Sequence, residues 1–412
     1  MFDRLSVFVG GCTVAAAGTV VDADPDVLQG LLDKNMLQRR VDGEPRLWML
    51  SSIREFAAEQ LETREEAPEI RRAHSRWCRE LAERADAELQ AGEPEELAVA
   101  AMDAEIDDLR AAVDFGVATD DPDLVRSITV ALPMYWIMRD RYAEARAWLE
   151  RALATSDVED ETRVRLLSAL ATMAYRQGDH SAAIAASDGA AELAMRLGGV
   201  TDRFQDLKLR ARRAWETGKL DEAVALYRQA LDAATEVDNG VGISACRLSL
   251  AALANQAGQH ERADEILHEN LPFVRGRGQS RCEAFTLAGL GQTAILRAFP
   301  REAADWAVSG AERALGFRER SLMAYCLDVA ATAFAEEGDP DPAAEILDAT
   351  ERARQLLDLV QDEDETAMRE RALASIGPVL VGPELDRAWS SGREMDLDQA
   401  LELATARLGQ AG

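Results

Sequence analysis

The sequence predicts an all-α fold, a solenoid of about six stacked helix pairs. Three observations predict it: a composition that favours helices, a turn signal that repeats every forty residues, and two columns of small residues in register with that signal. Hydrophobic residues make up 47% of the 412 residues but aromatic residues only 5%, while alanine, leucine, glutamate and arginine dominate. Such a balance is typical of soluble helices that pack closely through small side chains.

The turn signal is a glycine that recurs every forty residues. In two of the six units an aspartate or an alanine occupies the position of the glycine. The column consists of Asp140, Gly178, Gly218, Gly258, Ala298 and Gly338, and only its first interval differs, at thirty-eight residues. Each position lies in a short polar stretch between two apolar-periodic segments. A left-handed backbone at a glycine ends a helix there without steric cost. Each unit is therefore predicted to be a helix, a turn and a second helix.

Two columns of small residues accompany the turn signal. Five residues after it stand Ala145, Ala183, Ala223, Ala263, Ala303 and Ala343. Seven residues before it stand Pro133, Ala171, Ala211, Ala251, Gly291 and Ala331. Only small side chains fit where two helices cross at roughly 8 Å separation, so we expect each pair to cross at these columns. A single pair cannot bury both of its faces, and stacking on neighbouring pairs supplies the core.

This pattern resembles the tetratricopeptide repeat over residues 122–360. That repeat usually has about 34 residues, so the excess here implies longer helices or longer linkers. Units of this length are similar to those in the sensor arms of large bacterial signal-transduction ATPases. In the last unit, GDPDPAAEIL, we expect Asp341 to be the N-cap and Pro342 the first helical residue.

The two ends of the chain resemble segments of one more specific class of protein. FDRLSVFVGGCTVAAAG, followed by DVLQGLLDKNMLQRRVDGEPRLWMLSSIREFAAEQL, resembles the winged-helix segment that follows the nucleotide-binding domain in STAND-type ATPase regulators. Those proteins typically read R-L-x-V-F-x-G-G and later R-x-x-M-L-x-x-I-R-E-F/Y-A. The last stretch, GPELDRAWSSGREMDLDQALELATARL, is similar to their closing helices, and Asp396 and Gln399 have the spacing of a capping box.

The resemblance implies four segments, those of the C-terminal part of such a regulator without its nucleotide-binding domain. They are a winged-helix-like segment (1–60), connecting helices (61–121), tetratricopeptide-like repeats (122–360) and a C-terminal helical cap (361–412). Residues 51–120 are expected to form two long helices. The chain is then either a fragment of a longer regulator or a stand-alone relative.

Motifs that carry chemistry are lacking. No G-x-x-x-x-G-K-[ST] occurs, so the chain lacks the phosphate-binding loop with which the family hydrolyses ATP, and the Gly10-Gly11 pair is interpreted as a turn. The four histidines are isolated in the sequence and are interpreted as exposed helix or turn residues. The five cysteines form no C-x-x-C pair, which favours a reducing, cytoplasmic location. We expect no enzymatic activity, no cofactor and no metal.

The net charge of −29 disfavours direct contact with nucleic acid, because the surface would repel a phosphate backbone. The winged-helix-like segment could still bind DNA, since a helix and a wing form a DNA-binding surface in other proteins. Its basic residues are Lys34, Arg39, Arg40, Arg46 and Arg54, interleaved with Asp33, Asp42 and Glu44. DNA binding here is the less favoured alternative. No segment is apolar and long enough to predict a membrane span.

The candidate binding site is the inner groove of the stack. On the first helix of each unit, the positions thirteen, ten, six, three and two before the turn signal are expected to face the concave surface. They give Arg165, Tyr175, Arg176, Lys208, Arg212, Trp215, Asn255, Gln256 and Gln292. Cationic, amide and aromatic groups suit a protein or peptide partner or a small anionic effector. The alternative is that the aromatic residues pack between units and the arginines pair with neighbouring glutamates.

We therefore expect a ligand- or protein-binding sensor or scaffold module of a bacterial STAND-type regulator, LuxR-like or related, that acts by binding. An ATPase domain in cis or in trans is the further partner that the resemblance implies. A stand-alone tetratricopeptide scaffold is the alternative, and it would bind through the convex face or the ends of the stack.

Overall fold

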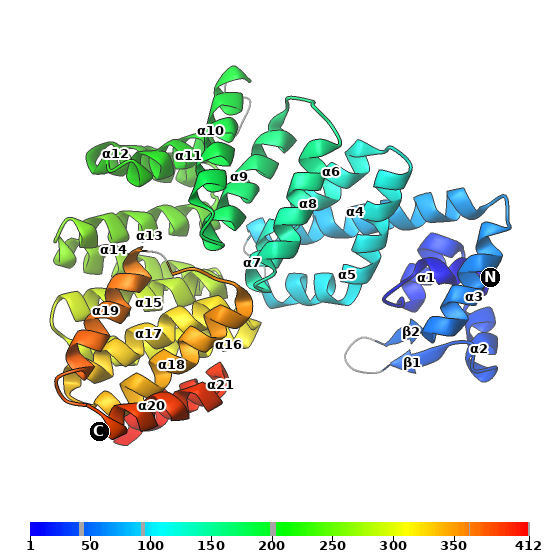
Figure 1. Cartoon of the computed structure of the whole chain (residues 1–412). Helices are drawn as coiled ribbons and strands as arrows, with labels where there is room; N and C mark the ends of the chain where they lie inside the picture. Colours follow the sequence, from blue (N-terminus) through cyan, green and yellow to red (C-terminus); the bar gives the residue numbers. More distant parts are fainter. Residues whose placement is uncertain (41–44, 92–94, 198–202, 362, 411–412) are drawn as a thin grey trace. The chain divides into compact units, whose positions relative to one another are not determined.

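Helices dominate the computed structural model, which describes the whole chain except residues 41–44, 92–94, 198–202, 362 and 411–412 (Figure 1). The chain divides into two compact units. Unit 1 consists of Met1–Ala87, Leu97–Leu132 and Glu150–Asp157, and unit 2 of Glu88–Glu96, Pro133–Leu149 and Val158–Gly412. The expected fold class, an all-α tetratricopeptide-like solenoid with a small N-terminal segment, is confirmed. The four-segment division stays a prediction.

Unit 1 begins with short helices and a two-stranded hairpin. The elements are η1 (Arg4–Val7), α1 (Val14–Val21), α2 (Pro25–Asp33), β1 (Gln38–Arg40), β2 (Arg46–Trp48) and α3 (Ser51–Glu62). The strands pair antiparallel, with Arg39 opposite Leu47. Local signals start the helices: Thr13 caps α1, and Asp24 caps α2 with Pro25 at its first position. Helices followed by a hairpin are the order expected of a winged-helix-like segment, and that identification stays a prediction.

Long helices follow the hairpin segment. They are α4 (Ala67–Ala91), α5 (Glu95–Ala118) and α6 (Pro122–Ala131). The two long helices predicted over residues 51–120 are present as α4 and α5, but a third, shorter helix, α3, occupies the start of this range. Helix α3 ends at Glu62 and α4 begins at Ala67, with Pro68 as its second residue. Proline lacks an N–H and fits only the first turn of a helix, so α3 cannot run on into α4.

Six helix pairs form the repeat region, as predicted. They are α7 (Pro133–Met138) with α8 (Tyr142–Ala154), α9 (Glu161–Arg176) with α10 (His180–Arg196), α11 (Arg203–Glu216) with α12 (Leu220–Glu236), α13 (Gly240–Gln256) with α14 (His260–Gly276), α15 (Ser280–Leu296) with α16 (Pro300–Phe317), and α17 (Arg320–Glu337) with α18 (Pro340–Leu357). From α9 to α18 each first helix packs on its own second helix. Helix α13 also contacts α15, and α15 contacts α17, so the first helices line one side of the stack.

The turn within each pair has a left-handed residue at the predicted position. All six positions have positive φ, including Asp140 (52°) and Ala298 (62°), which are not glycine. The residue after each turn position donates its N–H to the carbonyl four residues before that position, as from Lys219 to Ala214 at 2.8 Å and from Phe299 to Ala294 at 2.8 Å. This hydrogen bond is the one that closes a helix in a Schellman motif.

A second series of left-handed residues lies between pairs and was not predicted. Its members in the described part of the chain are Asp238, Gly278, Arg318 and Asp358. Helices α13 to α18 are therefore 17 or 18 residues long and are joined by short turns. The extra length relative to the usual repeat lies in the helices rather than in linkers.

The two columns of small residues lie where the helices cross. All six alanines that follow the turn are buried, at most 6% exposed. In the other column five residues are buried, and Pro133 is half-buried at the start of α7. A Cβ atom added to Gly291 would lie 3.0 Å from Val329 Cγ1 and 3.1 Å from Ala303 O. Helices α15 and α16 thus approach closely at this crossing, and an added methyl group would crowd the backbone of α16.

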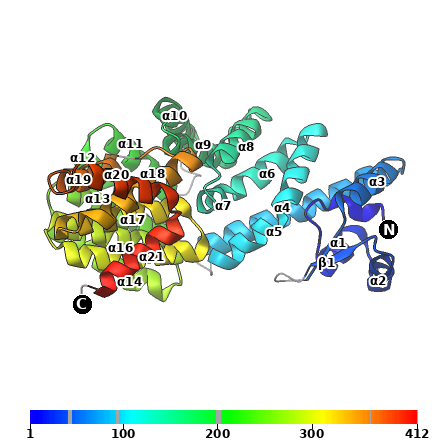
Figure 2. The same cartoon turned by 60° about the horizontal axis from the view of Figure 1, so that its bottom comes forward.

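Three further helices close the C-terminal end of unit 2. Helix α19 (Glu363–Ile376) packs on α17, while α20 (Pro383–Glu394) and α21 (Leu397–Gln410) pack on α18 (Figure 1 and Figure 2). The predicted capping box is confirmed: Asp396 N–H donates to Gln399 Oε1 and Gln399 N–H to Asp396 Oδ1, both at 2.9 Å.

The start of α18 differs from its prediction. The helix begins at Pro340 with Asp339 as the residue before it, two positions earlier than the expected Asp341 and Pro342. The sequence Asp-Pro-Asp-Pro contains two prolines that could each be the first residue of the helix. In the structure the helix begins at the earlier one. Among the described helices, none is both long and apolar enough to cross a membrane.

Candidate functional site

The nine groove residues predicted from the sequence all lie on the first helices of unit 2. Arg165, Tyr175 and Arg176 are on α9, Lys208, Arg212 and Trp215 on α11, Asn255 and Gln256 on α13, and Gln292 on α15. Eight of them are half-buried or exposed, whereas Gln292 is buried at 8% exposure. The candidate surface, which we call the inner ladder, consists of these nine residues.

Side chains of the inner ladder connect α9, α11 and α13 directly. The guanidinium carbon of Arg212 lies 5.0 Å from the ring centroid of Tyr175, within the range of a cation–π contact. Trp215 Nε1 donates to Gln256 Oε1 at 3.0 Å. The indole ring of Trp215 also packs edge-on against Tyr227 of α12, with centroids 6.2 Å apart. The aromatic side chains are thereby held in place before any ligand arrives.

The same kind of link continues from α13 to α17. Asn255 Nδ2 donates to Thr293 Oγ1 at 2.9 Å, and Tyr325 Oη donates to Gln292 Oε1 at 3.3 Å. Neither Thr293 nor Tyr325 was singled out from the sequence. Each link joins residues on neighbouring first helices, so polar contacts run along the row that these helices form.

The remaining cations of the inner ladder differ in their surroundings. Arg176 lies 5.9 Å from the ring of Tyr142 and 3.7 Å from Glu365 Oε1. Lys208 Nζ lies 5.6 Å from the ring of Phe204, and Arg165 is exposed on α9. The structure therefore brings Tyr175, Arg212, Trp215 and Gln256 together.

Both sequence interpretations find support in these contacts. Arg212 Nε is 2.9 Å from Glu216 Oε1, an i,i+4 ion pair, as the packing alternative expects. The side chain of Arg212 nevertheless keeps 33% of its surface exposed. An exposed ion pair of this kind contributes little to stability, so it can be exchanged for a ligand carboxylate at small cost.

Long-range contacts that the sequence did not predict fasten unit 2. The N–H of Arg281 donates to Glu95 Oε2 at 2.7 Å, and the N–H of Arg320 donates to Asp140 Oδ2 at 2.7 Å. The N–H of Val360 donates to the carbonyl of Arg176 at 3.3 Å. The first two contacts join residues 186 and 180 positions apart, and the third repeats this spacing. The first two contacts thus hold the N-termini of α15 and α17, and the third holds the segment that follows α18.

Asp140 is the most unusual residue of these contacts. Its carboxylate also accepts from the N–H of Ser321 and so caps the N-terminus of α17. Burial, together with the nearby negative charge of Glu319, raises the pKa of Asp140 to about 6 from its ordinary 3.8. Glu319 itself pairs with Arg281 at 2.7 Å. A carboxyl group that titrates near pH 6 therefore lies at this junction.

His74 in unit 1 is buried, and the expectation that the histidines are exposed is wrong for it. His74 Nε2 lies 2.9 Å from Asp108 Oδ1. Asp108 also accepts from the N–H groups of Val9 and Gly10, at 2.7 and 3.1 Å. Asp108 lies 34 positions from His74 in the sequence, so spacing gave no signal for this pair.

The Gly10-Gly11 pair forms a turn, as predicted. Gly11 has φ of 80°, and a Cβ there would lie 2.6 Å from the carbonyl oxygen of Leu47. Because the N–H of Gly10 already donates to Asp108, this turn does not offer that group to a phosphate. The close approach to β2 explains why glycine is required at position 11.

Two of the basic residues considered for DNA binding are engaged within unit 1. Arg46 Nη1 lies 2.5 Å from Glu105 Oε1, and its Nη2 donates to the carbonyl of Gly11 at 2.6 Å. The guanidinium carbon of Arg40 lies 4.4 Å from the ring of Trp48. Asp42 and Glu44 lie outside the described residues. These contacts weaken the argument for a phosphate-binding surface on the hairpin.

All five cysteines are buried and free. Burial raises the pKa of the Cys12 thiol to about 12 and that of Cys246 to about 11. Thiols with such pKa values are poor nucleophiles at neutral pH. Over the described part of the chain, no group of three potential metal ligands comes together.

Two solved structures show the kind of fold that this chain adopts. One is a signal transduction ATPase with numerous domains (STAND) protein with a tetratricopeptide repeat sensor from Pyrococcus horikoshii. It is 14% identical, and the match covers 100% of this chain and 64% of that protein, with a TM-score of 0.50. The other is a Rap protein complexed with competence and sporulation factor, 13% identical over 82% of this chain and 99% of that one, with a TM-score of 0.53.

These similarities establish a tetratricopeptide-like α-solenoid. The chain spans 64% of the length of the STAND protein. No protein-family model matches the sequence, and no curated protein matches it either.

Proposed function

We propose that the chain is the ligand- or protein-binding sensor module of a STAND-type regulator and that the inner ladder is its binding surface. The observation that carries this proposal is the cluster of Tyr175, Arg212, Trp215 and Gln256, which places two aromatic rings, a cation and an amide next to one another on successive helices. Aromatic residues and arginine dominate the energetics of protein interfaces. In a chain of net charge −29, this cluster favours an anionic group on the partner.

The fold and the two chain ends support the placement in this class of regulator. The STAND protein with a similar fold has a tetratricopeptide repeat sensor, and the Rap protein was solved with a bound factor. The N-terminal sequence and the closing helices resemble the corresponding segments of STAND-type regulators. An ATPase domain, in cis or in trans, is the partner that would receive the signal.

The mechanism we propose is binding coupled to a change in the curvature of the stack. The contacts Arg212–Tyr175 and Trp215–Gln256 join neighbouring first helices. A ligand that contacts several first helices therefore favours one spacing of those helices over others. The long-range contacts of Asp140 and Glu95 oppose such a change. Ligand binding would therefore stabilise the contacts between first helices at the expense of the long-range contacts of Asp140 and Glu95.

A peptide selection tests the proposal. Random linear peptides with free carboxyl termini are selected on the purified full-length protein, and their affinities are compared between the wild type, Arg212→Ala and Trp215→Ala. We expect the selected peptides to lose at least about tenfold in affinity on either variant, since each removes a charge-assisted or aromatic contact. The variants should keep the circular dichroism and melting temperature of the wild type.

Arg228→Ala is the matched control, because Arg228 is exposed on α12 outside the inner ladder. Its affinity should equal that of the wild type. Peptides that bind Arg212→Ala and Trp215→Ala as tightly as the wild type would reject the inner ladder as the site.

A stand-alone scaffold is the second candidate function, and exposed apolar residues favour it. Ile184 and Met195 of α10 are 52% and 66% exposed, which is typical of a contact surface when such residues occur together. In this case the selected peptides would lose affinity on Ile184→Ser and Met195→Ser but not on Arg212→Ala. The same selection therefore separates the two functions.

A further inference from the structure

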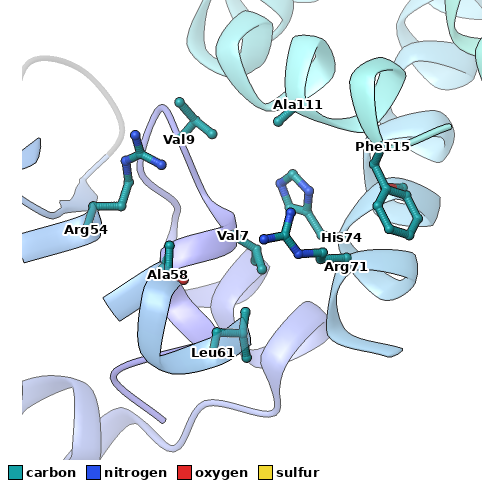
Figure 3. Close-up of a pocket in the computed structure, with 11 residues that line it drawn as sticks. Val7, Val9, Arg54, Ala58, Leu61, Arg71, His74, Ala111 and Phe115 are labelled. Carbon is teal, nitrogen blue, oxygen red and sulfur yellow. The ribbon is translucent and has the colours of Figure 1, made fainter. Parts of the chain in front are cut away.

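Unit 1 contains a cavity of about 110 Å³ at the meeting point of four elements (Figure 3). The segment around η1 forms one wall of the cavity. The other lining residues are Arg54, Ala58 and Leu61 of α3, Arg71, His74 and Ser75 of α4, and Ala111 and Phe115 of α5. In the view of Figure 3, Arg54 and Phe115 lie on opposite sides of the cavity, and Arg71 extends from α4 toward Val7. This cavity lies in unit 1, whereas the inner ladder lies in unit 2.

Two polar atoms of the cavity wall, the hydroxyl of Ser75 and the Nε of Arg71, have no hydrogen-bond partner among the described residues. Ser75 is only 2% exposed, and its hydroxyl has no hydrogen-bond partner among the described residues. The Nε of Arg71 is also buried without a partner there, although another nitrogen of the same guanidinium pairs with Glu62 at the surface. Buried polar groups are nearly always paired, and an unpaired one costs free energy.

The nearby acidic groups already have partners: Glu62 pairs with the Nη2 of Arg71, and Asp108 pairs with His74. The buried carboxylate of Asp108 accepts from Val9, Gly10 and His74, and Glu62 is 58% exposed. For Arg54 the described part of the chain shows no ion pair. Two guanidinium groups and a hydroxyl thus converge on a cavity with apolar walls and with no carboxylate among its lining residues.

We infer that this cavity binds a small oxyanion, with inorganic phosphate as the chemical type. An oxyanion offers several acceptor oxygens, and acceptors are what the Nε of Arg71 and the hydroxyl of Ser75 lack. A cavity of about 110 Å³ has room for one tetrahedral anion. Guanidinium groups bind phosphate oxygens through strong charge-assisted hydrogen bonds.

Occupation of the site would fasten α3 to α4. Arg54 is on α3, and Arg71 and Ser75 are on α4, so an anion held by all three bridges the hairpin segment and the long helices. A ligand that binds only the folded state raises the melting temperature as its concentration rises. Phosphate is thus expected to stabilise unit 1 without involving the inner ladder.

Titration calorimetry of the full-length protein with sodium phosphate tests this site, with sodium chloride balancing the ionic strength. We expect saturable binding of phosphate and of sulfate, and no saturable binding of chloride or acetate. Arg71→Gln should weaken phosphate binding at least about tenfold, because a hydrogen bond to a charged group is lost. Ser75→Ala and Arg54→Gln should weaken it as well, and they keep the test valid if Arg71→Gln fails to fold.

Arg76→Gln is the matched control, since Arg76 is exposed on the same helix and loses the same charge. It should bind phosphate like the wild type, and so should Arg212→Ala, which separates this site from the proposed function. Absence of saturable phosphate binding to the wild type overturns the inference. Equal weakening by Arg76→Gln and Arg71→Gln, which indicates a general charge effect, overturns it too.

Discussion

Replacing Gly291 by alanine tests whether helices α15 and α16 touch at the predicted crossing. Within a helix, alanine is more favourable than glycine by about 0.5–1 kcal/mol. Here the new methyl group would lie 3.0 Å from Val329 Cγ1 and 3.1 Å from Ala303 O, and such overpacking costs about 1–3 kcal/mol. We therefore expect Gly291→Ala to lower the free energy of unfolding by about 1 kcal/mol, the difference between these two effects.

Gly316→Ala is the control for this comparison. Gly316 lies near the end of α16, and a Cβ there would meet nothing within 4 Å, so only the helix-propensity gain of about 0.5–1 kcal/mol remains. Thermal unfolding followed by circular dichroism should give a melting temperature about 1 °C lower for Gly291→Ala and a higher one for Gly316→Ala. If both substitutions raise the melting temperature equally, the close crossing at Gly291 is refuted.

Three other substitutions have expected outcomes. Asp140→Asn should flatten the pH dependence of stability. The pKa of Asp140 is raised to about 6 in the folded protein, so its protonated form adds at most about 3 kcal/mol to the free energy of unfolding below pH 3.8, and this contribution is lost as the pH rises through 6. Melting temperatures at pH 5 and pH 8 should therefore differ less for Asp140→Asn than for the wild type. Asp108→Ala removes the acceptor of three buried donors, and urea unfolding should show a loss of about 3 kcal/mol; a loss below 1 kcal/mol would contradict that role. Asp396→Ala removes the cap of α21 and should cost about 0.5–2 kcal/mol in the same assay, whereas an unchanged midpoint would argue against the capping box.

The repeat region could be predicted because its constraints are local. A left-handed turn and a close helix crossing each demand a small residue, and both recur at a fixed spacing, so the six turns and both columns were found without coordinates. The turns between pairs escaped prediction because three of their four described left-handed residues, Asp238, Arg318 and Asp358, are not glycine. There the helix ends are set by packing rather than by a residue with a strong turn preference.

The candidate site was predictable only in part. Position within each first helix was enough to place Tyr175, Arg212 and Trp215 on one surface. The partners of the buried residues were not predictable, because they lie far away in the sequence: Asp108 for His74, and the N-terminus of α17 for Asp140. Such contacts depend on the curvature of the whole stack, which no single repeat encodes.

The substitution Ala298→Gly tests the forty-residue register most directly. Ala298 has φ of 62° at the position where four other units have glycine, and a left-handed backbone costs an L-residue about 1–2 kcal/mol. The account predicts that Ala298→Gly raises the melting temperature, whereas Ala225→Gly, at an exposed position inside α12, lowers it. A lower melting temperature for both variants would place Ala298 inside an ordinary helix and contradict the repeat.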